Sequence, residues 1–377
     1  MCAESLLGPP SALYCDTMTR VRYARVYDRQ AEPVGRSLLI GAAAALGAAA
    51  VARSIFRRRR HFDLQGKVAL VTGGSRGLGL LLARELHDRG ARVAICARDE
   101  DELAMACDEL AACGTEVLAL TCDVTDRDQV EEMLAQVREG LGPVDVLINN
   151  AGTIQVGPMD EMTVEDYDRA LRIHFWAPLF TTLGVLPNMR RRRAGRIVNI
   201  ASIGGKISVP HLLPYSASKF ALVGFSEGLH GALVRDGIYV TTVCPGLMRT
   251  GSPRNASFKG RHRAEYAWFS ISDSLPVASM SAPRAARRIV DACVDGDAEL
   301  VLPPTVDLAV RLSGLIPGAG PALMGLVDRL LPGPGGIGTD TRLGQESESA
   351  WSPSVLTTLG DRAAVDNNEI ATSEPHT

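Results

Sequence analysis

The feature that most constrains the fold is a regular alternation of short apolar runs with amphipathic segments, from about residue 63 to about residue 305. The runs are nearly continuously apolar, which is typical of strands buried on both faces of a sheet. Helical periodicity lies between them, for example at residues 78–90 and 130–142. Strands that alternate with helices form parallel sheets, so the pattern predicts an α/β fold with a doubly wound parallel sheet. The predicted strands are residues 67–72, 92–97, 116–124, 144–150, 195–202, 238–246 and 299–303.

Composition narrows the class of protein further. The chain has 377 residues, of which 46% are hydrophobic and 22% are charged, as in a globular protein. Its formal net charge of -3 argues against nucleic acid as the main partner. The eight cysteines show no metal-ligand spacing, so we expect no metal site and interpret the cysteines as reduced, mostly buried thiols.

Four regions are expected along the chain. Residues 1–35 show no steady period and are interpreted as a disordered tail, and residues 332–377, rich in Ser, Thr and Glu, as a mostly disordered C-terminal tail. Residues 36–56 hold an apolar run that we interpret as a membrane anchor, although it is slightly short for a spanning helix. An Ala-rich helix docked on the protein or on a partner subunit is the alternative. Residues 63–331, which hold the alternating pattern, are expected to form the main folded domain.

The first predicted strand ends in a glycine-rich turn that opens a helix. Gly73 permits the bend, Gly77 lets the backbone approach a pyrophosphate, and Gly79 allows helix and strand to pack closely. The helix N-terminus then offers free N–H groups and a positive dipole end to phosphates. The turn therefore predicts a dinucleotide site, with a plain tight turn as the alternative. The residues assigned to it are Gly73, Ser75, Arg76, Gly77, Leu78 and Gly79.

A tyrosine and a lysine form the pattern YxxxK at residues 215–219. Residues four apart share a helix face, so Lys219 is expected beside the Tyr215 phenol, where its charge favours phenolate and lowers the tyrosine pKa. Ser202 lies thirteen residues earlier, at the end of a predicted strand, where its hydroxyl can bind a substrate oxygen. These three residues are the predicted catalytic group, and a helix-surface pair with a strand-end serine is the alternative.

Together, the TGxxxGxG turn at 72–79, the NNAG segment at 149–152 and YxxxK resemble the standard-length short-chain dehydrogenase/reductase family over about residues 63–305. The resemblance implies a Rossmann fold and reversible hydride transfer between a nicotinamide and a carbonyl or secondary alcohol carbon. Tyr215 would transfer the proton, Ser202 would hold the substrate oxygen, and Lys219 would also bind the nicotinamide ribose. It further implies cofactor contacts by Asp123, Val124, Asn150, Ala151, Gly152, Tyr215, Lys219, Pro245, Gly246, Met248 and Thr250.

The end of the second predicted strand indicates which dinucleotide is used. NAD sites usually carry an acidic residue there, whereas this chain has Ala97 followed by Arg98. Arg98 and Arg76 can together clamp the extra phosphate of NADP by charge-assisted hydrogen bonds. We therefore predict NADP(H), with NAD(H) or dual use as the alternative.

One residue departs from the family pattern. His174 stands where the family has an asparagine that helps hold a proton-relaying water. Histidine can donate, accept and relay protons, so a relay or structural hydrogen-bond role near the site is expected. A packed histidine with no catalytic part is the alternative.

The segment of about residues 250–285 corresponds to the region that closes over the substrate in this family. It contains several large apolar side chains, which suggest a lid or pocket, with helices packed on the core as the alternative: Phe258, Tyr266, Trp268, Phe269 and Leu275. Beside the predicted anchor, such a lid favours a lipophilic carbonyl or alcohol substrate. The arginines at 57–60, directly after the apolar run, favour a location on the cytoplasmic face of a membrane, although further arginines precede the run. Family members are often dimers or tetramers, so a homo-oligomer is one option. An NADP(H)-binding regulatory or scaffold protein without turnover is the alternative function.

Overall fold

The structure is a computed structural model that describes residues 47, 57, 60–112, 117–274, 279–316, 318–354 and 357–370. The chain divides into two compact units, Met1–Phe56 and Arg57–Thr377. Gly47 is the one residue of the first unit that is described. The predicted tail at residues 1–35 and the rest of the predicted anchor at 36–56 therefore lie outside the described residues.

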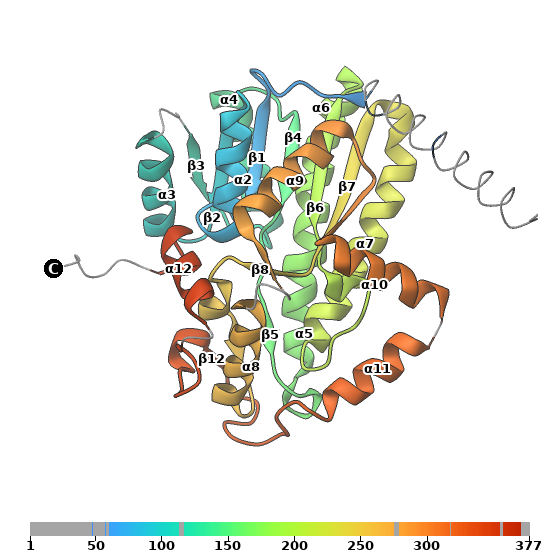
Figure 1. Ribbon diagram of the computed structural model, residues 1–377. Coiled ribbons are helices and arrows are strands. Elements are labelled where there is room, and N and C mark those ends of the chain that lie inside the picture. The colour runs from blue at the N-terminus through green and yellow to red at the C-terminus, as the bar shows by residue number, and fades with distance from the viewer. Residues whose placement is uncertain are drawn as a thin grey trace, which may run out of the picture. The chain divides into compact units, whose positions relative to one another are not determined.

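Seven parallel strands form the central sheet of the second unit, in the order β11-β7-β6-β4-β1-β2-β3 (Figure 1). Each predicted apolar run contains one of them, so the doubly wound parallel sheet is confirmed. Several observed strands are shorter than predicted because flanking residues of the runs belong to the connecting loops. The strands are β1 (Val68–Thr72), β2 (Arg92–Ala97), β3 (Leu118–Thr121), β4 (Val146–Asn149), β6 (Gly195–Ile200), β7 (Ile238–Pro245) and β11 (Glu299–Leu302).

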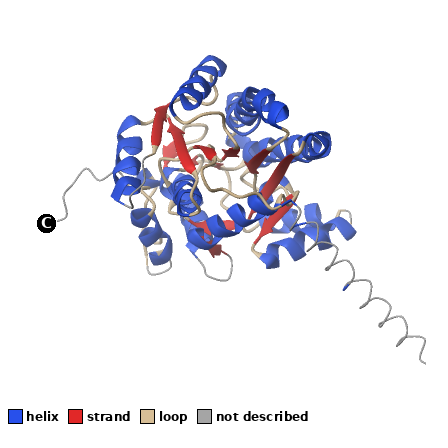
Figure 2. Ribbon diagram, turned by 90° about the horizontal axis from the view of Figure 1, so that it is seen from above, coloured by secondary structure: helices blue, strands red, loops and turns tan. Residues whose placement is uncertain are grey.

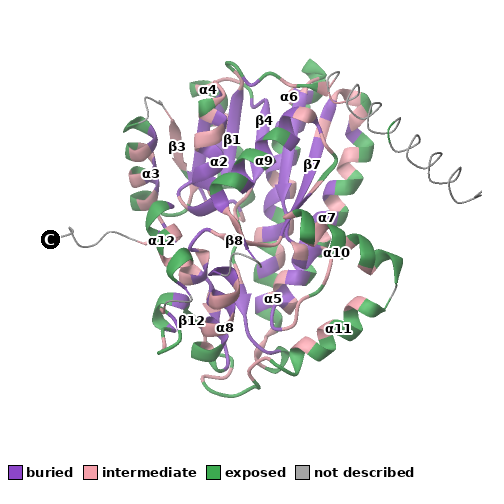
Figure 3. Cartoon of the chain, viewed as in Figure 1, coloured by how far each residue is buried: buried purple, intermediate pink, exposed green. Residues whose placement is uncertain are grey.

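Helices cover both faces of the sheet (Figure 2). Ala69 and Val71 of β1 belong to a buried cluster with α2, α3 and α9, whereas Val68 and Leu70 belong to a second cluster with α4 and α6. This alternation follows from the two-residue period of a strand, and it makes the sheet the most deeply buried layer (Figure 3). The helices of the two layers are α2 (Gly77–Asp88), α3 (Glu100–Ala112), α9 (Ala282–Asp295), α4 (Arg127–Gly140), α6 (Ala177–Arg192) and α7 (Leu213–Leu233).

Smaller elements lie beyond the carboxyl edge of the sheet (Figure 1). The strands β5, β9 and β12 form a three-stranded sheet, and β8 pairs with β10. The helix α5 leads through a π-helical turn at Arg172–Trp176 into α6. The bounds are β5 (Gln155–Val156), α5 (Val164–Leu171), β8 (Leu247–Arg249), β9 (Ser257–Phe258), α8 (His262–Ser274), β10 (Ser279–Ser281), α10 (Pro304–Leu315), α11 (Ala319–Asp328), β12 (Arg342–Leu343) and α12 (Thr358–Asp366).

The C-terminal region differs from its prediction. Residues 332–377 were expected to be mostly disordered, yet they contribute β12 and α12, and Ser347, Ser352 and Ala364 are fully buried. The physical reason is that polar groups of this region form hydrogen bonds with the domain. Its own sequence has no apolar periodicity that would predict this order.

Within the described residues, no single helix has the length and apolar character needed to cross a membrane. The pair α10 and α11, bent by 118°, meets that requirement only when both helices are taken together.

Candidate active site

The predicted site residues gather at the carboxyl edge of the sheet. The strands β1 and β4 are neighbours, and from them the chain winds outward to β3 on one side and to β11 on the other. Ligands of doubly wound sheets bind at this switch point. The loops after β1, β4, β6 and β7 carry the glycine turn, residues 150–152, Ser202 and residues 245–250, so one edge presents all four.

The glycine turn leaves little room for side chains, and backbone atoms block Gly73 and Gly79. A Cβ on Gly73, whose φ is +63°, would lie 2.8 Å from the Ala151 Cα. A Cβ on Gly79 would lie 1.8 Å from the Gly73 carbonyl oxygen. The close packing predicted for Gly79 is therefore what the backbone shows, and it brings the first turn of α2 against the end of β1.

Asn150 fixes the turn to the neighbouring strand. Its Nδ2 donates to the carbonyl oxygens of Thr72 and Gly73, at 3.1 and 3.0 Å. The Thr72 hydroxyl accepts the backbone N–H groups of Asn150 and Ala151, at 3.0 and 3.1 Å. These four bonds hold residues 150–152 beside the glycines, and Gly152 in turn lies against the His174 ring.

Ser202, Tyr215 and Lys219 converge from β6 and α7. The Ser202 side chain lies beside the Tyr215 phenol and lowers its pKa, and the Ser202 Oγ accepts the Gly204 N–H at 3.0 Å. The Lys219 Nζ lies 5.6 Å from the centre of the Tyr215 ring and donates to the Ile200 carbonyl oxygen at 2.8 Å. Lys219 and Ser202 are buried, whereas Tyr215 is half-buried. The structure thus brings together the three residues predicted from the sequence.

Burial dominates the protonation of this group. It raises the pKa of Tyr215 to about 12, against the opposing hydrogen bond from Ser202, and it lowers the pKa of Lys219 to about 7. The sequence predicted that the lysine charge would lower the tyrosine pKa. In the structure desolvation of the phenol sets the direction of the shift, and the opposing contribution comes from Ser202 rather than from Lys219. Tyr215 is consequently protonated at neutral pH, which is the form that donates a proton to a carbonyl oxygen.

His174 lies in the π-helical turn between α5 and α6, fully buried. Its Nε2 accepts the Thr153 backbone N–H at 3.2 Å, so in the neutral ring the proton must sit on Nδ1. The Nδ1 lies 2.8 Å from the Ser218 Oγ, whose own proton goes to the Tyr215 carbonyl oxygen at 2.8 Å. Burial and the nearby Lys219 hold the His174 pKa well below its ordinary value. Both ring nitrogens are occupied by protein groups, which favours a structural hydrogen-bond role over a water relay.

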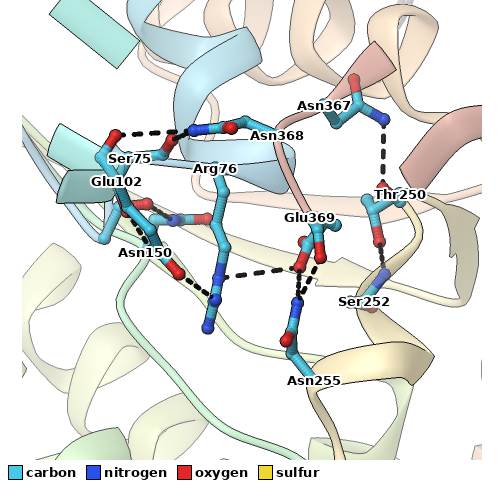
Figure 4. Close-up of polar contacts among 11 residues, drawn as sticks. Ser75, Arg76, Glu102, Asn150, Thr250, Ser252, Asn255, Asn367, Asn368 and Glu369 are labelled. Atoms are coloured by element: carbon cyan, nitrogen blue, oxygen red, sulfur yellow. Dashed lines mark hydrogen bonds and ion pairs between the residues drawn. The ribbon is translucent and has the colours of Figure 1, made fainter. Parts of the chain in front are cut away.

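The two arginines predicted to select the dinucleotide lie in different surroundings. Arg98 is exposed just beyond the end of β2. Arg76 forms an ion pair with Glu102, and its Nε lies 3.6 Å from the Glu369 Oε2 (Figure 4). The Ser75 hydroxyl donates to the same Glu102 at 3.0 Å. Arg76 is therefore held by carboxylates of the chain itself.

The remaining predicted cofactor contacts surround this edge. Asp123, after β3, accepts the Thr125 N–H at 2.9 Å and the Thr125 hydroxyl at 2.8 Å, and Val124 is buried. After β7, Pro245 ends the strand and the Gly246 N–H donates to the Leu302 carbonyl oxygen at 2.6 Å. Met248 lies in β8, and the buried Thr250 Oγ1 accepts the Ser252 N–H at 3.2 Å.

Sequence reasoning missed one part of the site. Asn367, Asn368 and Glu369, directly after α12, contact Gly77, Ser75, Arg76 and Thr250 (Figure 4). These three polar residues carry no periodicity, and their partners are far away in the sequence. No local signal in the chain pointed to this contact.

The predicted substrate region is an aromatic cluster beside Tyr215. Phe258, Tyr266 and Phe269 are buried together, with Trp268 and Tyr215 packed against them. Their burial favours the packing alternative for these rings, and Leu275 lies outside the described residues. A small cavity opens onto Tyr215 from the α5 side and is lined by Thr153, Gln155, Asp166, Arg169, Ala170 and Tyr215.

A parallel doubly wound sheet with a glycine turn and a Ser-Tyr-Lys group at its carboxyl edge defines a dinucleotide-dependent oxidoreductase by class. Comparison with known proteins specifies the family: residues 67–259 match the short chain dehydrogenase family model, and the chain belongs to that family. The protein is therefore an oxidoreductase of the short-chain type.

Three relatives illustrate the range of this family. A Streptomyces coelicolor protein with the provisional name ketoacyl reductase is 45% identical over 186 residues, which cover 49% of this chain and 71% of the relative. Mouse dehydrogenase/reductase SDR family member 7B is 32% identical over 300 residues, covering 78% and 90% of the two chains. A crystal structure of a variant of actinorhodin polyketide ketoreductase with NADPH is similar with a TM-score of 0.56 and 37% identity, covering 63% of this chain and 95% of the other.

Proposed function

We propose that the protein is an NADP(H)-dependent oxidoreductase that acts on the carbonyl or secondary alcohol group of a lipophilic substrate. The observation that carries this proposal is the convergence of Ser202 and Tyr215 beside the buried Lys219. A protonated phenol, a hydroxyl beside it and an amine one helical turn away form a site built for proton transfer to an oxygen atom.

The glycine turn fits the phosphates of a dinucleotide. It has no space for a Cβ at Gly73 or Gly79, and the Gly77 N–H and the Arg76 guanidinium both face oxygen acceptors in the structure. The turn, residues 150–152 and residues 245–250 would hold the cofactor, with Tyr215 and Lys219 at its nicotinamide end. When bound, the dinucleotide supplies the hydride for reduction or takes it up in oxidation.

The protein side chains then have separate roles in reduction. Tyr215 donates its proton to the substrate oxygen, and Ser202, which accepts the Gly204 N–H, keeps its own proton to hydrogen bond that oxygen. Lys219 orients the cofactor ribose and returns a proton to Tyr215. His174 fixes the backbone of α7 at Tyr215 through Ser218, so it is a positioning residue.

Three observations support NADP(H) over NAD(H). Ala97 stands where an NAD-specific site carries an acidic residue, and Arg76 and Arg98 lie near that strand end. The similar polyketide ketoreductase was solved with NADPH.

The names of two relatives refer to ketoacyl or polyketide ketone reduction, which supports a substrate with an apolar chain.

A substrate panel tests the proposal. Purified protein is incubated with ketones of increasing chain length and with small hydrophilic carbonyls, using NADPH and NADH in parallel. We expect NADPH to be consumed faster than NADH and long-chain ketones to be preferred. Tyr215→Phe should slow consumption by about 10²- to 10⁴-fold while leaving NADPH binding intact. Binding without turnover by the parent protein on every substrate would instead favour the regulatory or scaffold alternative.

The membrane anchor at residues 36–56 and a cytoplasmic-face location remain part of the proposal. The apolar run and the arginines at 57–60 support them. Cell fractionation with and without residues 1–56 tests the anchor: we expect the full chain in the membrane fraction and the shortened chain outside it. Equal distribution of both chains would contradict it.

A further inference from the structure

The chain brings its C-terminal region back to the cofactor site. The helix α12 packs on α8 and β8, and its Ala364 is fully buried. The fit is close, since a Cβ on Gly251 would lie 2.3 Å from the Ala364 Cα. The helix ends at Asp366, and the next three residues, Asn367, Asn368 and Glu369, enter the edge of the sheet where the phosphate turn lies (Figure 4). We call residues 367–369 the C-terminal plug.

Asn367 bonds groups from both sides of the predicted cofactor site. Its carbonyl oxygen accepts the Gly77 N–H at 2.7 Å, and its Nδ2 donates to the Thr250 carbonyl oxygen at 3.1 Å. The Gly77 N–H belongs to the start of α2, the group assigned to the pyrophosphate, and Thr250, after β7, is among the residues assigned to hold the cofactor. One residue of the plug therefore uses polar groups at two parts of that site.

Asn368 holds the outer side of the same turn. Its φ of +58° is left-handed, a conformation that asparagine adopts more readily than most residues. Its Nδ2 donates to the Ser75 carbonyl oxygen at 3.0 Å. The contact fixes the plug to the glycine turn by a side chain as well as by the backbone.

Glu369 brings a negative charge onto the turn. It is buried, and its carboxylate accepts the Asn255 Nδ2 at 2.6 Å and lies 3.6 Å from the Arg76 Nε. A Cβ on Gly77 would meet the Glu369 Oε1 at 2.5 Å, so the carboxylate rests directly on the glycine that was assigned to close approach of the pyrophosphate. An anion beside an arginine and the N-terminus of a helix has the same electrostatic partners as a bound phosphate.

We infer that the C-terminal plug is an autoinhibitory stand-in for the dinucleotide phosphates, and that it must leave the glycine turn before a cofactor binds. This inference rests on the proposed function, because it assigns the turn to NADP(H). Both ligands require the Gly77 N–H and the Arg76 guanidinium, so they exclude each other. Release of the plug removes Glu369 from Arg76 and leaves Glu102 as the carboxylate paired with it.

The consequence is a cofactor affinity that depends on the position of the plug. When only one state of a protein binds the ligand, the apparent affinity equals the affinity of that state multiplied by the fraction of molecules in it. A partner that captures α12 or the residues after it would raise the affinity for NADPH without touching the catalytic residues. The plug would thus couple events at the C-terminus to cofactor loading.

The test measures NADPH and NADH binding directly, by equilibrium titration of the full chain and of three variants. Glu369→Ala removes the carboxylate, and a chain that ends at Asp366 removes the plug. Asp366→Ala is the matched control, because it deletes an exposed carboxylate of the same region. We expect the first two to bind NADPH at least about tenfold more tightly than the parent, and the control to bind like the parent.

Hydrogen exchange on the unmodified chain provides a readout that does not depend on how the variants fold. Saturating NADPH should increase exchange in residues 358–370 while it protects the glycine turn. Equal affinities in all four chains, with unchanged protection of 358–370 in the NADPH complex, would overturn the plug and leave the proposed function standing. Absence of any dinucleotide binding, even in the chain that ends at Asp366, would overturn the proposed function and the plug with it.

Discussion

The Tyr215 cluster and the glycine turn, two regions of one site, obtain their partners in different ways. Tyr215, Ser218 and Lys219 lie within one stretch of α7, and Ser202 precedes them on the adjacent strand end. The glycine turn is instead contacted by Asn367 and Glu369, from the far end of the chain. The first region is therefore assembled by local helix geometry, and the second depends on how a distant segment docks.

The difference separates the part of the site whose catalytic residues are already assembled from the part whose cofactor-binding groups the C-terminal plug occupies. Ser202, Tyr215 and the buried Lys219 are already brought together. The Gly77 N–H and Arg76 are engaged with the chain itself. We therefore expect substitutions at the two regions to affect different measured quantities, and the following experiments break or sharpen that distinction, from the largest expected effect to the smallest.

The largest effect is expected from Tyr215→Phe. Loss of the phenol proton should lower kcat by about 10²- to 10⁴-fold, the usual contribution of general acid catalysis, without weakening NADPH binding. Steady-state kinetics and a binding titration measure the two quantities. Tyr239→Phe, in β7, is the matched control and should leave both unchanged. A large loss of NADPH affinity in Tyr215→Phe would erase the distinction between the two regions.

Gly79→Ala should affect the cofactor side. The new Cβ would lie 1.8 Å from the Gly73 carbonyl oxygen, so the turn must shift. Overpacking of this kind lowers the free energy of unfolding by about 1–3 kcal/mol, and we expect NADPH to bind more weakly as well. Denaturant unfolding and titration measure the effects. In the control, Gly231→Ala, the new Cβ meets nothing within 4 Å, so stability should stay equal or rise slightly. Normal NADPH binding by Gly79→Ala would show that the shape of the turn does not determine cofactor binding.

Lys219 should make stability depend on pH. Burial lowers its pKa to about 7, whereas an unfolded lysine titrates near ~10.4. Between these values the unfolded state binds a proton that the folded state lacks, so the free energy of unfolding should rise with pH, by at most about 1.4 kcal/mol per pH unit. The high pKa of Tyr215 lowers stability only above about pH 10, where unfolded tyrosine ionises.

Unfolding measured from pH 7 to pH 9 in the parent, in Lys219→Met and in the control Lys67→Met checks this expectation. Lys219→Met should reduce the slope, and Lys67→Met should keep it. A parent slope that survives in Lys219→Met would assign the pH dependence to another group.

The smallest effect is expected from His174→Asn, which introduces the residue type of the family pattern. Asparagine is shorter than histidine and cannot serve both Ser218 and the Thr153 N–H from this position. We expect a loss of about 1–2 kcal/mol of unfolding free energy, with kcat reduced by less than about tenfold. A loss of kcat close to that of Tyr215→Phe, with unchanged stability, would restore the relay interpretation.

The sequence was informative where structure follows from local pattern. Buried strands such as residues 92–97 are visible in the sequence as apolar runs. The glycine spacing predicted the close approach of Gly79 to Gly73 that the structure shows. It was misleading for the tyrosine pKa, because spacing shows the neighbouring lysine but not the desolvation that raises the pKa of the phenol. It could not show the plug, since Asn367 and Asn368 bond backbone groups, and Glu369 contacts side chains, that only the folded chain brings near them.

A crystal structure of the full chain with NADPH would test the central claim most directly. The account predicts a dinucleotide along the glycine turn, the bond between the Gly77 N–H and the Asn367 carbonyl oxygen broken, and Ser202, Tyr215 and Lys219 still together. A complex in which NADPH occupies that edge of the sheet while Asn367 and Glu369 keep their contacts with Gly77 and Arg76 would contradict it.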